Sequence, residues 1–459
     1  MKTLQYTKAI FGLCMGVMCY SCDSFTEVDL PQTQLTGEAV YQDEVTATAA
    51  LSDIYARMRE NGVVSGNTDG LSPLMGLYAD ELTFYGNAMA PADNFYNHTL
   101  IPSNAYVSSL WSNSYAQIYA ANALFEGVSN SAISGEPRNR LVGEALFIRA
   151  LIHFYLVNLY GDIPYIETTN YQVNAHVSRM PATLVYDRII NDLQTSKNLL
   201  PDSYTSTERI RANKAAAQAL LARVYLYQQQ WSLAESEATS VINNPTFNME
   251  TNLDAAFLNT NPSTILQMHS GIAGANTNEG RLFIFTSGPP VSMAASNELV
   301  NAFETNDLRK THWLKSVTDG TNVWYHPYKY KQNANTGVSQ EYSILFRLEE
   351  QYLIRAEARA HQNNISGAQD DINIIRNRAG LGNTGAATQS DLLQAISKER
   401  QVELFTEVGH RWFDLKRTGQ AAAVVAPIKP SWQNTDVLLP LPESELILNP
   451  NLQPQNSGY

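Results

Sequence analysis

The sequence predicts a mostly α-helical fold, built from helical hairpins and a less regular, loop-rich part. Apolar residues recur at the spacing of one helix face, for example at Trp111, Tyr115 and Ile118. Two segments carry paired alanines at the spacing of packed hairpin helices. Long stretches rich in Gly, Asn, Pro and Tyr separate the helical segments.

The segment from Arg140 to Tyr160 is apolar on nearly every side, which is typical of a helix buried all round. The turn Gly161-Asp-Ile-Pro164 would end it. Helical spacing recurs further on, at Val185, Ile189, Leu193, Ser196 and Leu200. Thr183 would be the N-cap of that helix.

Two segments, 214–245 and 350–380, predict helical hairpins. Ala222 and Ala234 are twelve residues apart in the first, and Ala356 and Ala368 are twelve apart in the second. Small residues at this separation lie where the paired helices of a tetratricopeptide repeat touch. We therefore expect tetratricopeptide-like hairpins, with the apolar stripes forming core.

The expected organisation of residues 22–459 is a single domain. Its helical scaffold would occupy about 40–60, 105–245 and 343–420, and its irregular regions about 61–104 and 246–342. The irregular regions lack sustained helical periodicity, and their many aromatic residues disfavour disorder. Irregular stretches of this length in compact proteins are usually functional or disordered, so we expect these two to carry function.

Composition excludes several classes of function. The chain of 459 residues has 44 acidic and 31 basic residues and a net charge of −13, which argues against nucleic acid as a partner. All three cysteines lie within the first 22 residues. The body therefore holds no disulfide framework, cysteine-based zinc site, iron–sulfur cluster or thiol nucleophile.

The N-terminus is similar to a bacterial lipoprotein signal. Lys2 and Lys8 precede an apolar run, 9–20, which has the length of a signal-peptide core and is too short to span a bilayer. Small Ser21 directly precedes Cys22. We expect residues 1–21 to be removed and Cys22 to carry the lipid; an ordinary secretory signal is the alternative.

The common catalytic and cofactor motifs are missing or out of context. No pair of histidines flanks a glutamate at metalloprotease spacing, and no Gly-x-Ser-x-Gly elbow occurs. The stretch 380–385 matches the dinucleotide fingerprint, but it follows an expected helix and not a strand, so we interpret it as a helix end and loop. A pair of carboxylates for glycoside hydrolysis remains an alternative, because the sequence does not show the distance between any two acidic side chains. We expect no metal and no cofactor.

The densest charged segment, 398–417, interleaves acidic and basic residues with apolar ones. Arg400 lies on the stripe of Leu404, and Glu403 and Glu407 follow three and seven residues after it. Such a pattern suits an active-site network, but more often it is a structural lattice of ion pairs, because buried charges must be paired.

Two aromatic segments, 78–97 and 313–330, are the candidate ligand-binding loops. Aromatic faces stack on the C–H face of a sugar ring, and amides or carboxylates bind its hydroxyls. Packing within the loops is the competing interpretation for each residue. The candidate carbohydrate-binding residues are Asp80, Tyr85, Tyr96, Asn97, Trp324, Tyr325 and Tyr328.

Taken together and in order, several segments resemble the SusD/RagB family of outer-membrane nutrient-binding lipoproteins. They are the signal ending at Cys22, GEALFIRALIHFYLVNLYGDIPY at 143–165, ALLARVYLYQQQW at 219–231, INIIRNRAGL at 372–381, ERQVELFTEVGHRWFDLKR at 399–417 and the C-terminal tail. One departure is Val408, which separates Glu407 from Gly409 where the family usually joins them.

The resemblance implies a mostly helical, SusD-like fold in which the irregular regions, about 61–104 and 246–342, bind the ligand. It also implies a lipid-anchored protein of the outer membrane that faces the cell exterior. It implies a partner, a SusC-like TonB-dependent transporter, and a role in capturing oligosaccharides without catalysis. It assigns no ligand residues by motif. A peptide-binding member of the family, a surface glycoside hydrolase and a protein-binding scaffold are the alternatives.

Overall fold

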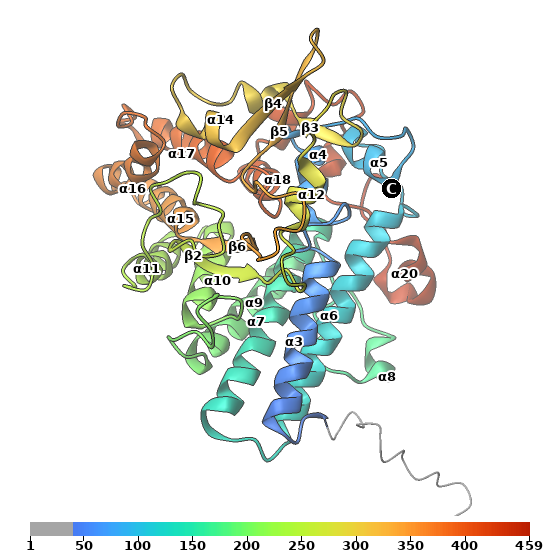
Figure 1. The fold of residues 1–459 in the computed structure, drawn as a ribbon. Coiled ribbons are helices and arrows are strands. Elements are labelled where there is room, and N and C mark those ends of the chain that lie inside the picture. Colours follow the sequence, from blue (N-terminus) through green and yellow to red (C-terminus); the bar gives the residue numbers. More distant parts are fainter. Residues whose placement is uncertain (1–39) are drawn as a thin grey trace, which may run out of the picture.

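Four long helices pack together on one side of the computed structural model, which describes residues 40–459 (Figure 1). They are α3 (Glu44–Glu60), α6 (Ala105–Ser129), α7 (Gly135–Tyr160) and α9 (Ala182–Leu199). Helix α7 lies at their centre, in contact with the other three. Every residue of α7 from Leu141 to Tyr160 is buried, which confirms the helix expected to be buried all round.

Helix α7 is the one helix within residues 40–459 that is long and apolar enough to cross a membrane. The apolar stretch that gives it this character is wholly buried inside the protein. Its composition is therefore accounted for by its place in the core.

The start of α9 differs from the expectation. Its N-cap is Pro181, which makes no side-chain bond, and Thr183 lies inside the first turn. The backbone N–H of Ala182 donates to Asp162 Oδ1 at 2.8 Å instead. A carboxylate from the preceding turn therefore satisfies this helix end, which a local capping pattern does not predict.

The two predicted hairpins are present. Helices α10 (Lys214–Tyr227) and α11 (Trp231–Ile242) form the first, and α15 (Leu348–His361) and α16 (Ile365–Arg378) form the second. All four alanines of the twelve-residue pairs are fully buried. Helix α11 also packs against α15, and α17 (Gln389–Glu403) packs on α15 and α16, so the hairpins stack into one row.

The glycine-rich stretch after α16 is a helix end and loop, as expected. Gly380 has a φ of +76°, the left-handed conformation that ends many helices. The preceding element is a helix and not a strand, so the dinucleotide motif lacks its required context.

The regions expected to be irregular contain short helices and strands. The helices are α4 (Leu71–Tyr78), α5 (Pro91–Asn97), α12 (Asn278–Phe283), α13 (Asn297–Val300) and α14 (Leu308–Trp313). None exceeds eight residues. Two turns or fewer are too short to establish a periodic pattern in a sequence, which is why these helices were not predicted.

Two small antiparallel sheets complete the middle of the chain. One has the order β1-β3-β5-β4 and comprises β1 (Leu82–Phe84), β3 (Met293–Ala295), β5 (Val323–Pro327) and β4 (Leu314–Thr318). The other pairs β2 (Thr264–Met268) with β6 (Ser343–Arg347), and both strands are fully buried. The first sheet lies at the opposite end of the molecule from residue 40 (Figure 1).

The C-terminal segment is ordered and packs along the helical core. It contains α18 (His410–Arg417), α19 (Ala421–Val425), α20 (Glu443–Leu448) and two 3-10 turns, Asn434–Val437 and Pro450–Leu452. A further short helix, α8 (Tyr171–Asn174), lies between α7 and α9 in the chain and is not part of this segment. Leu439 N–H donates to Leu159 O at 2.8 Å. Tyr78 Oη donates to Asp436 O at 2.8 Å. These bonds hold the tail against α7 and α4.

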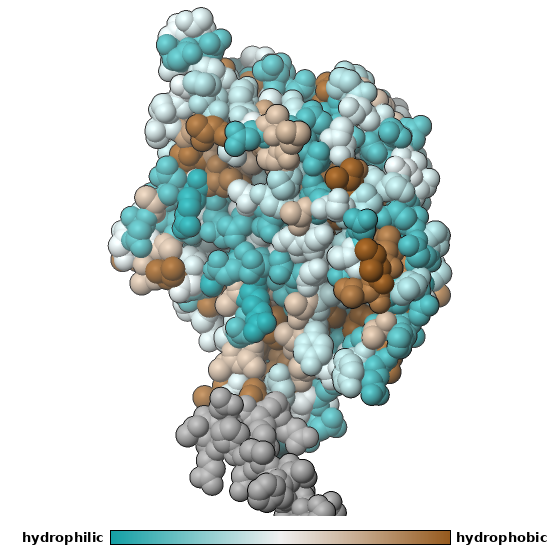
Figure 2. All heavy atoms as spheres, turned by 90° about the vertical axis from the view of Figure 1, so that its right-hand side faces the viewer, coloured by the Kyte–Doolittle hydropathy of each residue, from teal (hydrophilic) through white to brown (hydrophobic). Residues whose placement is uncertain are grey.

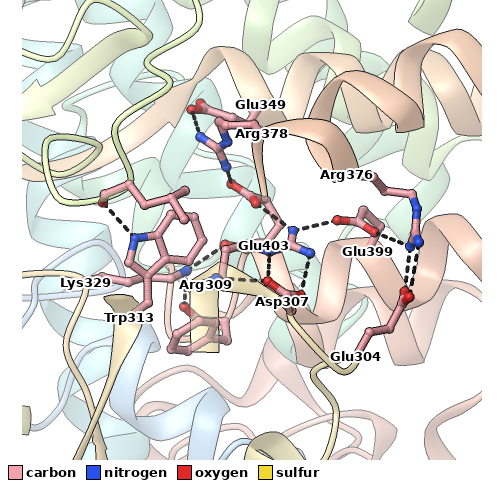
Figure 3. A network of polar contacts seen from close by, with 12 residues as sticks. Glu304, Asp307, Arg309, Trp313, Lys329, Glu349, Arg376, Arg378, Glu399 and Glu403 are labelled. Atoms are coloured by element: carbon pink, nitrogen blue, oxygen red, sulfur yellow. Dashed lines mark hydrogen bonds and ion pairs between the residues drawn. The ribbon is translucent and has the colours of Figure 1, made fainter. Parts of the chain in front are cut away.

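The charged segment 398–417 contributes to a buried ion-pair network (Figure 3). Arg309 contacts Asp307, Glu399 and Glu403. Glu403 also receives Arg347 and Arg378, so three guanidinium groups surround it. Burial alone would raise the pKa of Glu403, but these arginines hold it well below its usual range. Glu399 and Glu403 of this segment are therefore paired with buried arginines, as the structural interpretation expects.

The departure at Val408 falls between α17 and α18. Thr406, Val408 and Gly409 all have left-handed backbone, with φ of 54°, 44° and 77°. The N–H of Val408 donates to Ser72 Oγ at 3.1 Å, which ties this turn to α4. A β-branched residue is uncommon in that conformation, and α17 ends at Glu403, six residues before Gly409.

Polar side chains prevail on the face shown in Figure 2, and apolar ones form several separate patches there. Exposed apolar residues include Ile447 and Leu448 on α20. Scattered apolar residues of this kind are normal on soluble surfaces.

Candidate functional site

Five of the seven predicted ligand-binding residues line one hollow of about 270 Å³ beside the four-stranded sheet. They are Asp80, Tyr85, Tyr96, Trp324 and Tyr325. Three stretches of chain meet there: the loops around β1, the strands β3 and β5, and the C-terminal segment after α19. The hollow is close to the lower end of the size range of small-molecule sites, roughly 300 Å³.

Strand β5 supplies the indole and one phenol. Its sequence, Val-Trp-Tyr-His-Pro, is rich in the β-branched and aromatic residues that favour strands. Trp324 pairs with Val317 on β4, and Tyr325 pairs with Ala295 on β3. Both aromatic side chains are half-buried, so each keeps surface that a ligand can contact.

Gly288 brings the chain directly against the ring of Trp324. A Cβ at this position would lie 2.2 Å from Trp324 Cζ3, a distance that real contacts do not reach. Any larger residue would displace the indole. The glycine therefore sets the position of the largest aromatic surface in the hollow.

The other wall comes from the loops on either side of β1. Tyr85 directly follows β1, and its backbone N–H donates to the carbonyl oxygen of Ser292, which directly precedes β3, at 2.7 Å. This bond continues the antiparallel pairing of β1 with β3 by one residue. Tyr96 lies on α5. This helix is held to the start of α6 by a hydrogen bond from Asn104 Nδ2 to Asn94 Oδ1 at 3.0 Å. Tyr85 is 40% exposed and its ring is open to solvent.

Asp80 lines the hollow but is already engaged. Arg411 Nε and Nη2 donate to its two carboxylate oxygens at 2.7 and 2.6 Å, and Gln401 Nε2 donates at 3.2 Å. The Asp80 side chain is 4% exposed. Asp80 is thus mainly part of a buried ion pair beside the hollow, which the sequence pattern did not suggest.

Lys429 is a functional candidate that sequence reasoning missed. Its Nζ lies 3.3 Å from the centre of the Tyr96 ring, and the residue is 4% exposed yet lines the hollow. Burial lowers the pKa of Lys429 to about 7, although Glu298 and Asp80 oppose the shift. No local motif marks this lysine, because its contacts come from parts of the chain some 330 residues away. 

Asn97 and Tyr328 lie outside the hollow. Asn97 Nδ2 donates to Asp93 Oδ1 at 2.9 Å within α5. The Tyr328 ring instead receives the ammonium groups of Lys315 and Lys331, at 4.8 and 4.5 Å from its centre. Residues of the hollow that were not predicted include Thr83, Ser296, Asn297, Glu298 and Lys429.

This arrangement suits binding of a polar, ring-shaped ligand. Aromatic rings offer flat apolar faces, and hydroxyl, amide and carboxylate groups around them accept or donate hydrogen bonds. Within residues 40–459, no group of His, Asp and Glu side chains is arranged to hold a metal ion.

Comparison with known proteins identifies the family. Residues 34–226 match a family model described as "Starch-binding associating with outer membrane", and residues 263–459 match the model of the SusD family. The SusD-like protein P2 of Formosa agariphila is 31% identical over 433 aligned residues, which cover 79% of this chain and 83% of the relative. The chain belongs to the SusD/RagB family.

Solved structures of the SusD superfamily have the same fold. A SusD superfamily protein from Bacteroides vulgatus aligns with a TM-score of 0.80 at 21% identity, over 91% of this chain and all of the other. A structure titled "Laminarin binding SusD-like protein" aligns with a TM-score of 0.78 at 24% identity, over 91% of this chain and all of the other. The expected mostly α, SusD-like fold is confirmed.

Proposed function

We propose that the protein is a cell-surface glycan-binding lipoprotein that captures oligosaccharides and delivers them to a SusC-like, TonB-dependent outer-membrane transporter. The observation that carries the proposal is the convergence of Tyr85, Tyr96, Trp324 and Tyr325 on one hollow, in a chain of the SusD family. Aromatic stacking holds a sugar ring without requiring it to be charged.

Other features support the same role. One structural neighbour is named for binding laminarin, and the family model for the N-terminal half refers to starch and the outer membrane. Delivery to a transporter and anchoring through Cys22 rest on family membership and on the signal sequence. The proposal assigns no catalytic residue.

Calorimetric titration against a panel of polysaccharides, laminarin included, tests glycan binding. We expect at least one glycan to bind, and Trp324→Ala to weaken that binding about five- to thirty-fold, because loss of one stacking face costs on the order of 1–2 kcal/mol. Tyr171→Ala is the control, since Tyr171 is 75% exposed on α8 and does not line the hollow. Binding to no glycan, or equal losses in both variants, would contradict the proposal.

The alternatives give different results in the same preparation. A glycoside hydrolase would release reducing ends from the bound glycan, and Glu298→Gln would abolish the release, because Glu298 is the carboxylate at the hollow that Arg411 does not hold. A peptide-binding member would bind a peptide panel and no glycan. A scaffold would bind neither and would still co-purify with the transporter.

A further inference from the structure

A second cavity, larger than the aromatic hollow, lies on the helical half of the molecule. It has a volume of about 810 Å³ and lies among the α10–α11 hairpin, α15, α17, α18 and α19. This volume is within the range of small-molecule sites, roughly 300–1,000 Å³. Nothing in the glycan-binding proposal uses this cavity.

The charged residues that line this cavity are unequal in number. Four are basic and two are acidic: Lys398, Arg400, Arg411, Arg417, Glu357 and Asp414. Arg417 contacts both acids, and Arg400 Nε shares Asp414 at 2.6 Å. Arg411 is paired with Asp80. Even with Asp80 included, one positive charge remains without a carboxylate.

Arg400 is buried at this cavity, and only its Nε is paired. Its side chain is 1% exposed, and neither Nη1 nor Nη2 has a hydrogen-bond partner. A buried guanidinium normally donates from these atoms, and leaving them unpaired costs free energy. An anion in the adjoining cavity would reduce that cost through the low-dielectric interior.

Lys398 is the exposed part of the excess. Its Nζ has one weak hydrogen bond, to Gln401 Oε1 at 3.5 Å. Burial and the nearby positive charge of Arg411 both lower the pKa of Lys398, although Asp80, Glu304 and Glu399 oppose them. The Lys398 ammonium therefore has a single long hydrogen bond in the structure, and a ligand carboxylate could pair with it.

An apolar wall stands near these cations. Trp231 and His361 stack with ring centres 3.8 Å apart and planes 8° apart, and Leu393 and Val424 add aliphatic surface. Burial lowers the pKa of His361, so its imidazole is neutral and adds no charge at pH 7. The cavity thus offers an apolar face and a positive one.

We propose that this cavity binds a sugar acid, with the ligand carboxylate toward Lys398 and Arg400 and its ring toward the Trp231 and Leu393 wall. A uronic acid has both features: an apolar C–H face and one negative charge. The site is separate from the aromatic hollow. Asp80 lines the hollow and Arg411 lines this cavity, so their ion pair forms part of the partition between the two.

Calorimetric titration of the full chain with glucuronate and with neutral glucuronamide tests the proposal. The two probes differ only in the charge of one group. We expect glucuronate to bind at least about ten-fold more tightly, and its affinity to fall as salt is raised, because salt screens the attraction to Lys398. Equal affinity for the two probes, or binding of neither, would overturn the proposal.

Variants locate the binding. Lys398→Gln should weaken glucuronate binding about five-fold, whereas Lys310→Gln, a lysine on α14 outside the cavity, should leave it unchanged. Arg400→Lys keeps the charge but loses the fork of donors, and it should also weaken binding. Trp324→Ala should not affect glucuronate. Unchanged affinity in Lys398→Gln, or an equal loss in Trp324→Ala, would show that the sugar acid binds elsewhere.

Discussion

At the scale of single residues, the aromatic hollow depends on groups that are not aromatic. Gly288 leaves the space that the Trp324 ring occupies, and the Lys429 ammonium packs on the face of the Tyr96 ring. Arg411 engages both oxygens of Asp80. The residues that a ligand would touch are therefore positioned by residues that it would not.

Gly288→Ala tests this positioning. The new methyl group would collide with Trp324 Cζ3 and displace the indole, so we expect glycan affinity to fall about ten-fold. Calorimetry gives the affinity, and tryptophan fluorescence reports the displaced ring. Gly385→Ala is the matched control, because a Cβ there meets no atom within 4 Å. Unchanged affinity in Gly288→Ala would contradict this role.

Lys429 makes stability depend on pH. Its folded-state pKa of about 7 lies below the unfolded value of roughly 10.4, so below pH 7 the lysine is charged in both states and its burial cost is complete. The cost declines as pH rises from 7 toward 10. Lys429→Met removes this cost at every pH. We therefore expect the stability advantage of the variant over wild type to shrink by about 3 kcal/mol between pH 6 and pH 9.

Urea denaturation at the two pH values measures this difference. Other titrating groups contribute equally to the pH dependence of both proteins, so their contributions cancel when the variant is compared with wild type. One such group is Glu81, whose pKa is raised to about 8 by burial and by Asp80. Lys310→Met controls for the loss of a lysine. A difference that is the same at both pH values would show that Lys429 keeps its ordinary pKa in the folded protein.

At the scale of elements, buried ion pairs join the helices that apolar packing brings together. Glu403, at the end of α17, pairs with Arg309 from α14 and Arg378 from α16 (Figure 3). It also pairs with Arg347 from the end of β6. Arg223 of α10 likewise pairs with Glu350 of α15, at 2.7 Å. The network links the hairpin row to α14, whose last residue, Trp313, directly precedes β4 of the four-stranded sheet.

Glu403→Gln should therefore destabilise the protein by about 3–5 kcal/mol, because it leaves three buried guanidinium groups without their shared carboxylate. Urea denaturation followed by circular dichroism measures the loss. Glu443→Gln, an exposed glutamate in the first turn of α20, should change stability by less than about 0.5 kcal/mol. Similar values for the two variants would mean that the network adds no stability.

The Glu403 carboxylate also makes the stability of the protein depend on pH in the acid range. The folded-state pKa of Glu403 is held well below the unfolded value, so its stabilisation is present above the unfolded pKa of about 4.3. It is lost as the pH falls through the folded pKa. We expect Glu403→Gln and wild type to converge in stability as denaturation is measured at progressively lower pH below 4. A constant difference down to pH 2 would contradict this assignment.

At the scale of the whole molecule, the hollow forms where three distant parts of the chain meet. Residues 80–96, 295–325 and 428–429 all contribute to it. The four-stranded sheet beside it lies at the end of the molecule away from residue 40, where the described chain begins (Figure 1). The predicted anchor, Cys22, lies outside the described residues.

Cys22→Ser tests the anchor. We expect it to abolish fatty-acid labelling and to move the protein out of the membrane fraction, since stable anchoring needs more than one acyl chain on that residue. Cys19→Ser is the control, because residue 19 belongs to the predicted signal peptide and would leave with it. Labelling that persists in Cys22→Ser would contradict the lipoprotein assignment.

The sequence by itself determined the helical class, the two hairpins with their buried alanines, and the structural nature of the charged segment 398–417. These features arise from local periodicity and from the rule that buried charges must be paired. It also singled out the aromatic segments, of which Tyr85, Tyr96, Trp324 and Tyr325 meet in one hollow.

Only the tertiary structure decided which aromatic residues share that hollow and which polar groups join them. Asn97 and Tyr328 belong to the same aromatic segments as the residues of the hollow but lie outside it. Lys429 lies in neither segment, so nothing in the sequence pointed to it. The short helix α4 and the cap of α9 by Asp162 were likewise invisible. The reason is physical: contacts between residues far apart in the chain depend on how the elements pack, and local periodicity carries no record of that packing.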